Sequence, residues 1–197
     1  METSRSVVIV LFVLFAVVFA TNVQAFTIYR VGPEMRGQEY NDASKEWLDR
    51  RFSVWVGIDE KKTELVYFMG DSSTSGAATV RVKNSKDLRA ELETAVSTAI
   101  EWSKVARMNK ADANKVLGCF GDCSAEAGNR MGLRFLAANS GKQTDLVIKM
   151  VDMDNQSITA YMHLELSEMV KLLEVIKGIS EAMEKARDAS SKQDLFK

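Results

Sequence analysis

The first feature of the chain is a pair of residue types that together catalyse hydrolysis in many enzymes: a serine in a glycine-bounded segment and a single histidine. Ser72 lies in the segment 70–76, Gly-Asp-Ser-Ser-Thr-Ser-Gly, and His163 lies far along the chain. A serine hydroxyl becomes an effective nucleophile when a histidine takes its proton and a carboxylate orients that histidine. Hydrolase chemistry therefore requires a fold that brings Ser72 and His163 together.

The residues before and within this segment, Val-Tyr-Phe-Met followed by Gly-Asp-Ser, resemble the nucleophile block of the GDSL-type (SGNH) esterases. The resemblance implies that Ser72 is the nucleophile and His163 the base of a small serine esterase built on a parallel sheet. The chain departs from that pattern at Ala160, where the family has an Asp three residues before the His. The alternative interpretation is a polar hairpin loop, because Gly, Asp, Ser and Thr are common in turns. In that case His163 is a half-exposed strand residue near Glu165.

Two cysteines, Cys119 and Cys123, are the second candidates for chemistry. Residues four apart in a glycine-containing loop can reach the Cα separation of about 5.5 Å that a disulfide prefers. An even pair in an exported protein predicts a disulfide. Thiol redox chemistry usually uses two intervening residues, and here there are three. A zinc or copper site needs three or four ligands, and the chain has one histidine. We expect a structural disulfide, no cofactor and no metal, with redox and metal chemistry as alternatives.

The first 25 residues predict export. Arg5 is followed by the unbroken apolar run 7–20, and residues 23–25, Val-Gln-Ala, match the small-residue pattern that a signal peptidase cuts. The run is shorter than the roughly 20 apolar residues that span a membrane comfortably. We expect cleavage after Ala25 and a mature periplasmic or secreted protein that begins at Phe26. An uncleaved segment acting as a membrane anchor is the alternative.

The composition narrows the function classes. The chain carries 26 Lys and Arg against 27 Asp and Glu, a formal net charge of −1. Nucleic-acid binders usually carry a basic stripe, so this balance argues against that class. No second long apolar run follows the leader, so the mature chain should be soluble, with no membrane contact. The partner we expect is a protein or a small ligand, and a homo-oligomer is possible because a β-meander leaves unpaired sheet edges.

A pattern that occurs twice predicts the elements that position these residues. Residues 63–66, Thr-Glu-Leu-Val, return as Thr-Asp-Leu-Val at 144–147, an offset of 81 residues. Alternation and helical spacing predict strands and helices in the same order around both copies. The strands are at 52–58, 63–69, 78–83, 132–138, 145–151 and 157–165, and the helices begin at N-caps Ser85 and Ser167. The expected fold is α+β: two β-β-β-α units forming a pseudo-symmetric, mostly antiparallel sheet with two long helices packed on one face.

The expected organisation divides the chain into six segments. They are a signal peptide (1–25), an N-terminal lead-in with a short helix at Ser44–Arg51 (26–51), a first unit (52–110), a cysteine-containing connector (111–130), a second unit (131–189) and a polar tail (190–197). The patterns favour an exported, soluble, non-catalytic binding protein. A GDSL-like esterase using Ser72 and His163 is the second hypothesis, and a thiol redox or metal-handling protein using Cys119 and Cys123 is the third.

Overall fold

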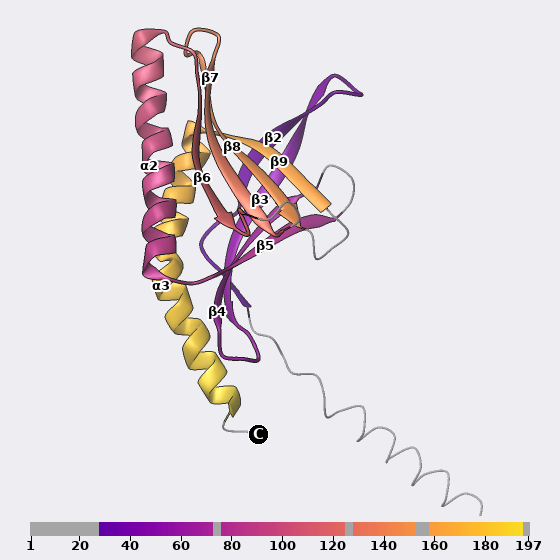
Figure 1. Ribbon diagram of the computed structural model, residues 1–197, viewed down its shortest axis with the longest axis vertical. Coiled ribbons are helices and arrows are strands. Elements are labelled where there is room, and N and C mark those ends of the chain that lie inside the picture. The colour runs from indigo at the N-terminus through magenta and orange to yellow at the C-terminus, as the bar shows by residue number, and fades with distance from the viewer. Residues whose placement is uncertain (1–27, 73–75, 125–127, 153–157, 195–197) are drawn as a thin grey trace, which may run out of the picture.

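The computed structural model describes residues 28–72, 76–124, 128–152 and 158–194, and it has the expected α+β class (Figure 1). The elements are β1 (Ile28–Arg30), β2 (Met35–Asn41), β3 (Glu46–Ile58), β4 (Glu64–Asp71), β5 (Ala77–Lys83), α2 (Lys86–Asn109), β6 (Ala113–Gly121), β7 (Arg130–Ala138), β8 (Gln143–Asp152), β9 (Ile158–Glu165) and α3 (Leu166–Asp194). The expected signal segment 1–25 lies outside the described residues, so export stays a prediction.

The described strands form one antiparallel sheet in the order β5-β4-β3-β2-β9-β8-β7-β6, with β1 paired to β3. Each half is a meander of sequential neighbours. The halves meet where β2 pairs with β9, at Gln38 opposite His163. The first strand of one half therefore lies beside the last strand of the other.

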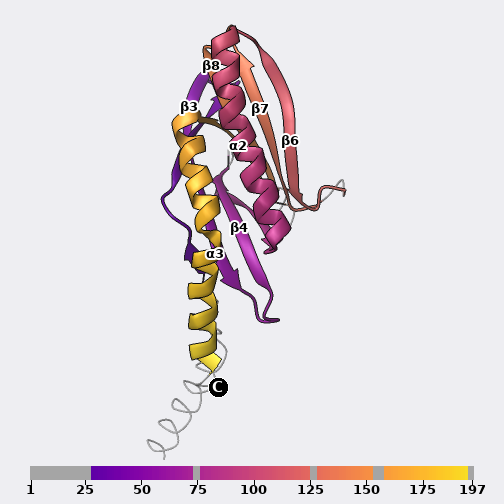
Figure 2. The same cartoon turned by 90° about the vertical axis from the view of Figure 1, so that its left-hand side faces the viewer.

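Both helices pack on one face of the sheet and against each other, as predicted (Figure 2). Their apolar residues recur at three and four positions, which places them on one side of each helix. Ser85 is the N-cap of α2, because its Oγ accepts a hydrogen bond from the backbone N–H of Leu88 at 3.0 Å. The second predicted cap is wrong: α3 begins at Leu166, so Ser167 lies inside its first turn. In the described part of the chain no helix combines the length and apolar character needed to cross a membrane.

The sheet curves around the core. β5 contacts β8 and β9, which lie well along the sheet order, and the backbone N–H of Thr79 donates to Asp152 Oδ2 at 3.0 Å. Gly70 of β4 packs so closely on the inner side chains of β9 that a Cβ there would lie 2.7 Å from Met162 Cε. The apolar core is therefore enclosed between the inner face of the sheet and the two helices.

The predicted short helix at 44–51 is wrong, because these residues form the turn and the first part of β3. Asn41 Oδ1 accepts hydrogen bonds from the backbone N–H groups of Ala43 and Ser44, and Lys45 adopts a positive φ of 60°. This side-chain-to-backbone bonding favours a turn over a helix. The lead-in 26–51 therefore supplies strands to the sheet.

Two other segments also differ from expectation. The predicted connector 111–130 contains β6, so four meander strands precede each helix where we predicted three. The predicted polar tail from 190 is helical as far as Asp194. The bounds nevertheless follow the offset of 81: β5 shifts to 158–164, inside β9, and α2 shifts to 167–190, inside α3. A superposable internal duplication stays a prediction.

Candidate functional site

The structure places Ser72 and His163 on different parts of the sheet. His163 is opposite Gln38 of β2, and Gln38 is opposite Asp49 of β3. Ser72 follows the last residue of β4, which lies on the other side of β3. Strands β2 and β3 therefore lie between the two residues that a serine esterase would need in hydrogen-bond contact.

The two side chains also belong to opposite faces. His163 lies between Met162 and Leu164, which are buried in the core, so its own side chain points to the outer face. Ser72 continues the alternation of β4 that buries Phe68 and Gly70, and it is itself buried. The sheet is antiparallel, whereas the esterase resemblance implies a parallel one. The geometry therefore gives the Ser72–His163 pair no support.

His163 has a different partner, Asp145 of the neighbouring strand β8. The distance from His163 Nδ1 to Asp145 Oδ2 is 3.1 Å, and the same oxygen accepts a hydrogen bond from Gln143 Nε2 at 2.8 Å. The side chains of His163 and Asp145 are only 12% and 5% exposed. A buried carboxylate bonded to one ring nitrogen fixes the orientation of an imidazole. This contact therefore holds His163 rigidly at the centre of the outer face.

Three half-exposed aromatic residues surround His163, and we call Tyr40, Trp47, Tyr161 and His163 the aromatic cluster. The His163 ring lies edge-on to Trp47 at 5.3 Å and to Tyr161 at 5.4 Å, and Tyr40 lies 5.4 Å from Trp47. Edge-to-face packing at these distances is favourable. Tyr40, Trp47 and Tyr161 remain 41%, 45% and 40% exposed. The cluster joins both halves of the molecule, since two of its strands belong to each.

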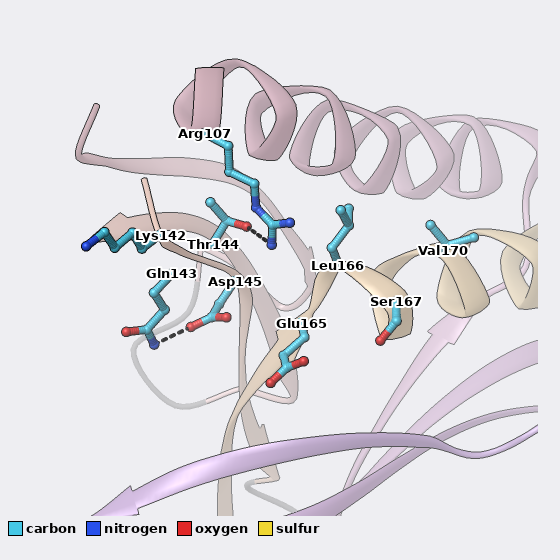
Figure 3. Close-up of a pocket in the computed structure, with 9 residues that line it drawn as sticks. All are labelled: Arg107, Lys142, Gln143, Thr144, Asp145, Glu165, Leu166, Ser167 and Val170. Carbon is cyan, nitrogen blue, oxygen red and sulfur yellow. Dashed lines mark hydrogen bonds between the residues drawn. The ribbon is translucent and has the colours of Figure 1, made fainter. Parts of the chain in front are cut away.

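A pocket of about 560 Å³ borders the same Asp145, between the end of α2, the start of β8 and the start of α3 (Figure 3). Its lining residues are Arg107, Lys142, Gln143, Thr144, Asp145, Glu165, Leu166, Ser167 and Val170. Arg107 Nη2 donates a hydrogen bond to Thr144 Oγ1 at 3.1 Å, which ties α2 to β8. The pocket therefore presents charges of both signs beside apolar side chains.

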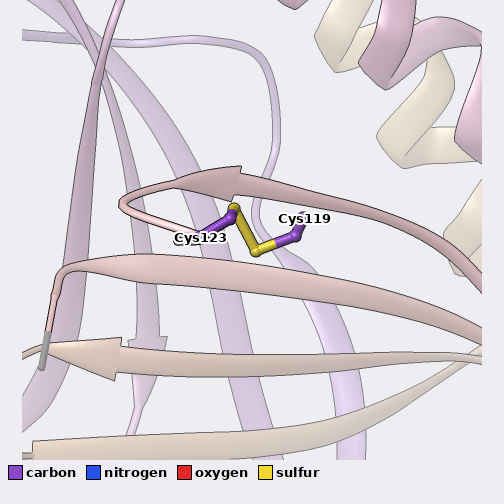
Figure 4. Close-up of a disulfide and its surroundings, with 2 residues drawn as sticks. All are labelled: Cys119 and Cys123. Atoms are coloured by element: carbon purple, nitrogen blue, oxygen red, sulfur yellow. A yellow bond between two sulfur atoms is a disulfide. The ribbon is translucent and has the colours of Figure 1, made fainter. Parts of the chain in front are cut away.

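The predicted disulfide between Cys119 and Cys123 is present, with a Cα separation of 5.9 Å (Figure 4). It closes the end of β6, the strand at one edge of the sheet. Both cysteines of the chain are in this bridge. Among the described residues, no group of three or more His, Cys, Asp or Glu side chains is arranged to hold a metal ion.

Sequence reasoning found His163 and missed its surroundings. Asp145 alternates with the buried Leu146, so the outward series of β8 was readable, but its pairing with His163 depends on the register of the β8–β9 hairpin. Trp47 was missed because the segment that contains it was interpreted as a helix.

Comparison of this chain with protein-family models, with curated proteins and with solved structures finds no match.

Proposed function

We propose that this chain is an exported, non-catalytic binding protein and that its aromatic cluster binds a partner protein. The carrying observation is the exposure of Tyr40, Trp47 and Tyr161 side by side on the outer face. Scattered exposed apolar side chains are normal on a protein surface, whereas contiguous ones mark interaction sites. Tyrosine and tryptophan are enriched among the few residues that provide most of the energy of protein interfaces.

The support beneath the cluster strengthens the proposal. Trp47 and Tyr161 each pack on His163, and His163 is fixed by Asp145. Rings that are already ordered lose little conformational entropy when a partner covers them. Polar and charged side chains border the cluster, including exposed Asp49 and Lys149. An aromatic centre with a polar rim is the usual composition of a protein interface.

The export part of the proposal rests on the leader sequence and on the disulfide. Disulfides persist in oxidising compartments outside the cytoplasm, and Cys119–Cys123 is bridged. Mass spectrometry of the protein recovered from the periplasm or the medium should give a chain that begins at Phe26. A chain that retains residues 1–25 would contradict cleavage after Ala25.

The binding experiment compares capture by three forms of the exported protein: wild type, Trp47→Ala and Met108→Ala. Met108 is a matched control because it is 74% exposed and lies on α2, which covers the other face of the sheet. We expect wild type and Met108→Ala to capture the same extracytoplasmic protein. Trp47→Ala should bind that protein about 100-fold more weakly, since interface tryptophans typically contribute about 2–4 kcal/mol.

A second variant, Tyr161→Ala, tests the cluster from the other half of the chain. It should also weaken the affinity, while its circular dichroism spectrum matches that of wild type. Equal affinity for wild type, Trp47→Ala and Tyr161→Ala would show that the partner binds elsewhere.

A further inference from the structure

The pocket beside α3 holds opposite charges that do not pair with each other. Arg107 and Glu165 both line it together with Asp145. Within the described part of the chain, neither Arg107 nor Glu165 forms an ion pair at the 4.0 Å limit, and the hydrogen bond of Arg107 goes to the neutral Thr144. Figure 3 shows the Arg107 side chain entering the pocket from α2 and the two carboxylates on the strands opposite it.

The carboxylate of Asp145 has one oxygen available to a ligand. Both hydrogen bonds to Asp145, from His163 and Gln143, end on Oδ2. No fully buried side-chain nitrogen or oxygen among the described residues lacks a hydrogen bond, so Oδ1 keeps contact with solvent. Asp145 and Glu165 are directly opposite each other in the β8–β9 register. Two carboxylates on one side of a cavity create a strong preference for a cation between them.

The remaining lining is partly apolar. Leu166 and Val170 lie one turn apart at the start of α3, and they form one end of the pocket in Figure 3. Val170 is one of the few large hydrophobic side chains of this protein that are exposed. A pocket of this volume, with apolar walls and a few convergent charges, fits a small molecule.

We propose that this pocket binds a free α-amino acid with an aliphatic side chain. Its carboxylate pairs with Arg107, its ammonium group lies between Asp145 and Glu165, and its side chain packs on Leu166 and Val170. In such a molecule the nitrogen and the carboxyl carbon are only about 2.5 Å apart. A zwitterion therefore satisfies both signs of charge in one small cavity, whereas a simple anion or cation satisfies only one. The proposal does not depend on the aromatic cluster.

Isothermal titration calorimetry on the exported protein tests the ligand class with L-leucine, L-leucinamide and N-acetyl-L-leucine. The amide lacks the carboxylate and the acetylated form lacks the ammonium group, while both keep the side chain. We expect L-leucine to bind and each analogue to bind at least about tenfold more weakly, since each loses charge-assisted hydrogen bonds. No heat from L-leucine at millimolar concentration, or equal affinity for L-leucinamide, would overturn the proposal.

Glu165→Gln and Lys149→Gln test the site itself. Glu165 is exposed and makes no hydrogen bond or ion pair with another described residue, so its substitution should leave the fold intact. It should weaken L-leucine binding about tenfold. Lys149 is exposed on β8 but does not line the pocket, and its substitution should leave the affinity unchanged. Equal affinities of wild type and Glu165→Gln would place the amino acid elsewhere. Trp47→Ala should bind L-leucine normally, which separates this proposal from the proposed partner binding.

Discussion

Glu64 of β4 and Asp145 of β8 are 81 residues apart, and they occupy matching places in the two halves with different results. Glu64 is enclosed by its neighbours: Arg187 of α3 donates to both of its carboxylate oxygens, and Asn84 Nδ2 donates at 2.8 Å. Asp145 has no arginine or lysine against it. It accepts hydrogen bonds from His163 and Gln143 on one oxygen only.

The residues opposite these two acids explain the difference. Asn84, an amide, lies beside Glu64, whereas Glu165, which is 81 residues further along, puts a second carboxylate opposite Asp145. The first place is a closed ion pair that joins α3 to the sheet. In the second place the cation, Arg107, stays on the other wall of a pocket. The same position in a strand thus contributes to stability in one half and leaves charge available for a ligand in the other.

The largest effect that would break this comparison should come from Gly141→Ala, in the turn before β8. Gly141 has a φ of 71°, and a Cβ there would lie 2.2 Å from the backbone oxygen of Ala106 in α2. The turn would have to move away from the helix, which would also disturb the Arg107–Thr144 bond. We expect a loss of about 3 kcal/mol in the free energy of unfolding, measured by denaturant titration.

The matched control is Glu60→Ala, because Glu60 lies 81 residues earlier in the exposed turn before β4. It should change the free energy of unfolding by less than about 0.5 kcal/mol. If Gly141→Ala proved equally mild, the close contact between this turn and α2 would not be important for the pocket.

The next effect compares the two acids directly, by Asp145→Ala and Glu64→Ala. The first change leaves the buried donors of His163 and Gln143 without their acceptor, and such a loss costs about 1–3 kcal/mol. The second breaks a partly exposed ion pair, which contributes roughly 0–1 kcal/mol. Thermal and denaturant unfolding of both variants should therefore show the larger loss for Asp145→Ala. The reverse order would indicate that Glu64 is the structural keystone and that Asp145 is dispensable to the fold.

Alternation and helical spacing were sufficient to predict the second half of the fold. Leu146 and Ile148 alternate with outward residues in β8, and Ser85 caps α2 where predicted. The first half was harder because Trp47 and Leu48 are adjacent, a pattern that suits a helix turn or a strand equally well. Only the Asx turn at Asn41 and the pairing with β2 decide for a strand.

The candidate site was less accessible than the fold. His163 stood out as the single histidine, but its function was sought with Ser72, a neighbour of neither its strand nor its face. The pocket depends on Arg107, Asp145 and Glu165, which are ordinary charged residues in the sequence. Their meeting is set by the β8–β9 register and by the angle at which α2 returns to the sheet. Neither quantity can be obtained from local sequence patterns.

The smallest effect concerns pH and the Glu64–Arg187 pair. Hydrogen bonds from Arg187 hold the pKa of Glu64 below its usual value, with burial acting in the opposite direction and Asn84 adding to the lowering. Because the pKa is lower in the folded state, the pair stabilises the fold fully above the unfolded pKa of about 4.3, and this contribution is lost as pH falls through the folded value.

A double-mutant cycle of Glu64→Gln and Arg187→Gln isolates this contribution. The coupling free energy, from denaturant unfolding, should be below about 1 kcal/mol near neutral pH because both side chains are partly exposed. It should disappear in acid, where the carboxyl group is protonated and resembles the Gln variant. A coupling that kept its size in acid would show that Arg187 holds Glu64 by hydrogen-bond geometry alone, independently of charge. The closed place in the first half would then differ from the open pocket in shape rather than in electrostatics.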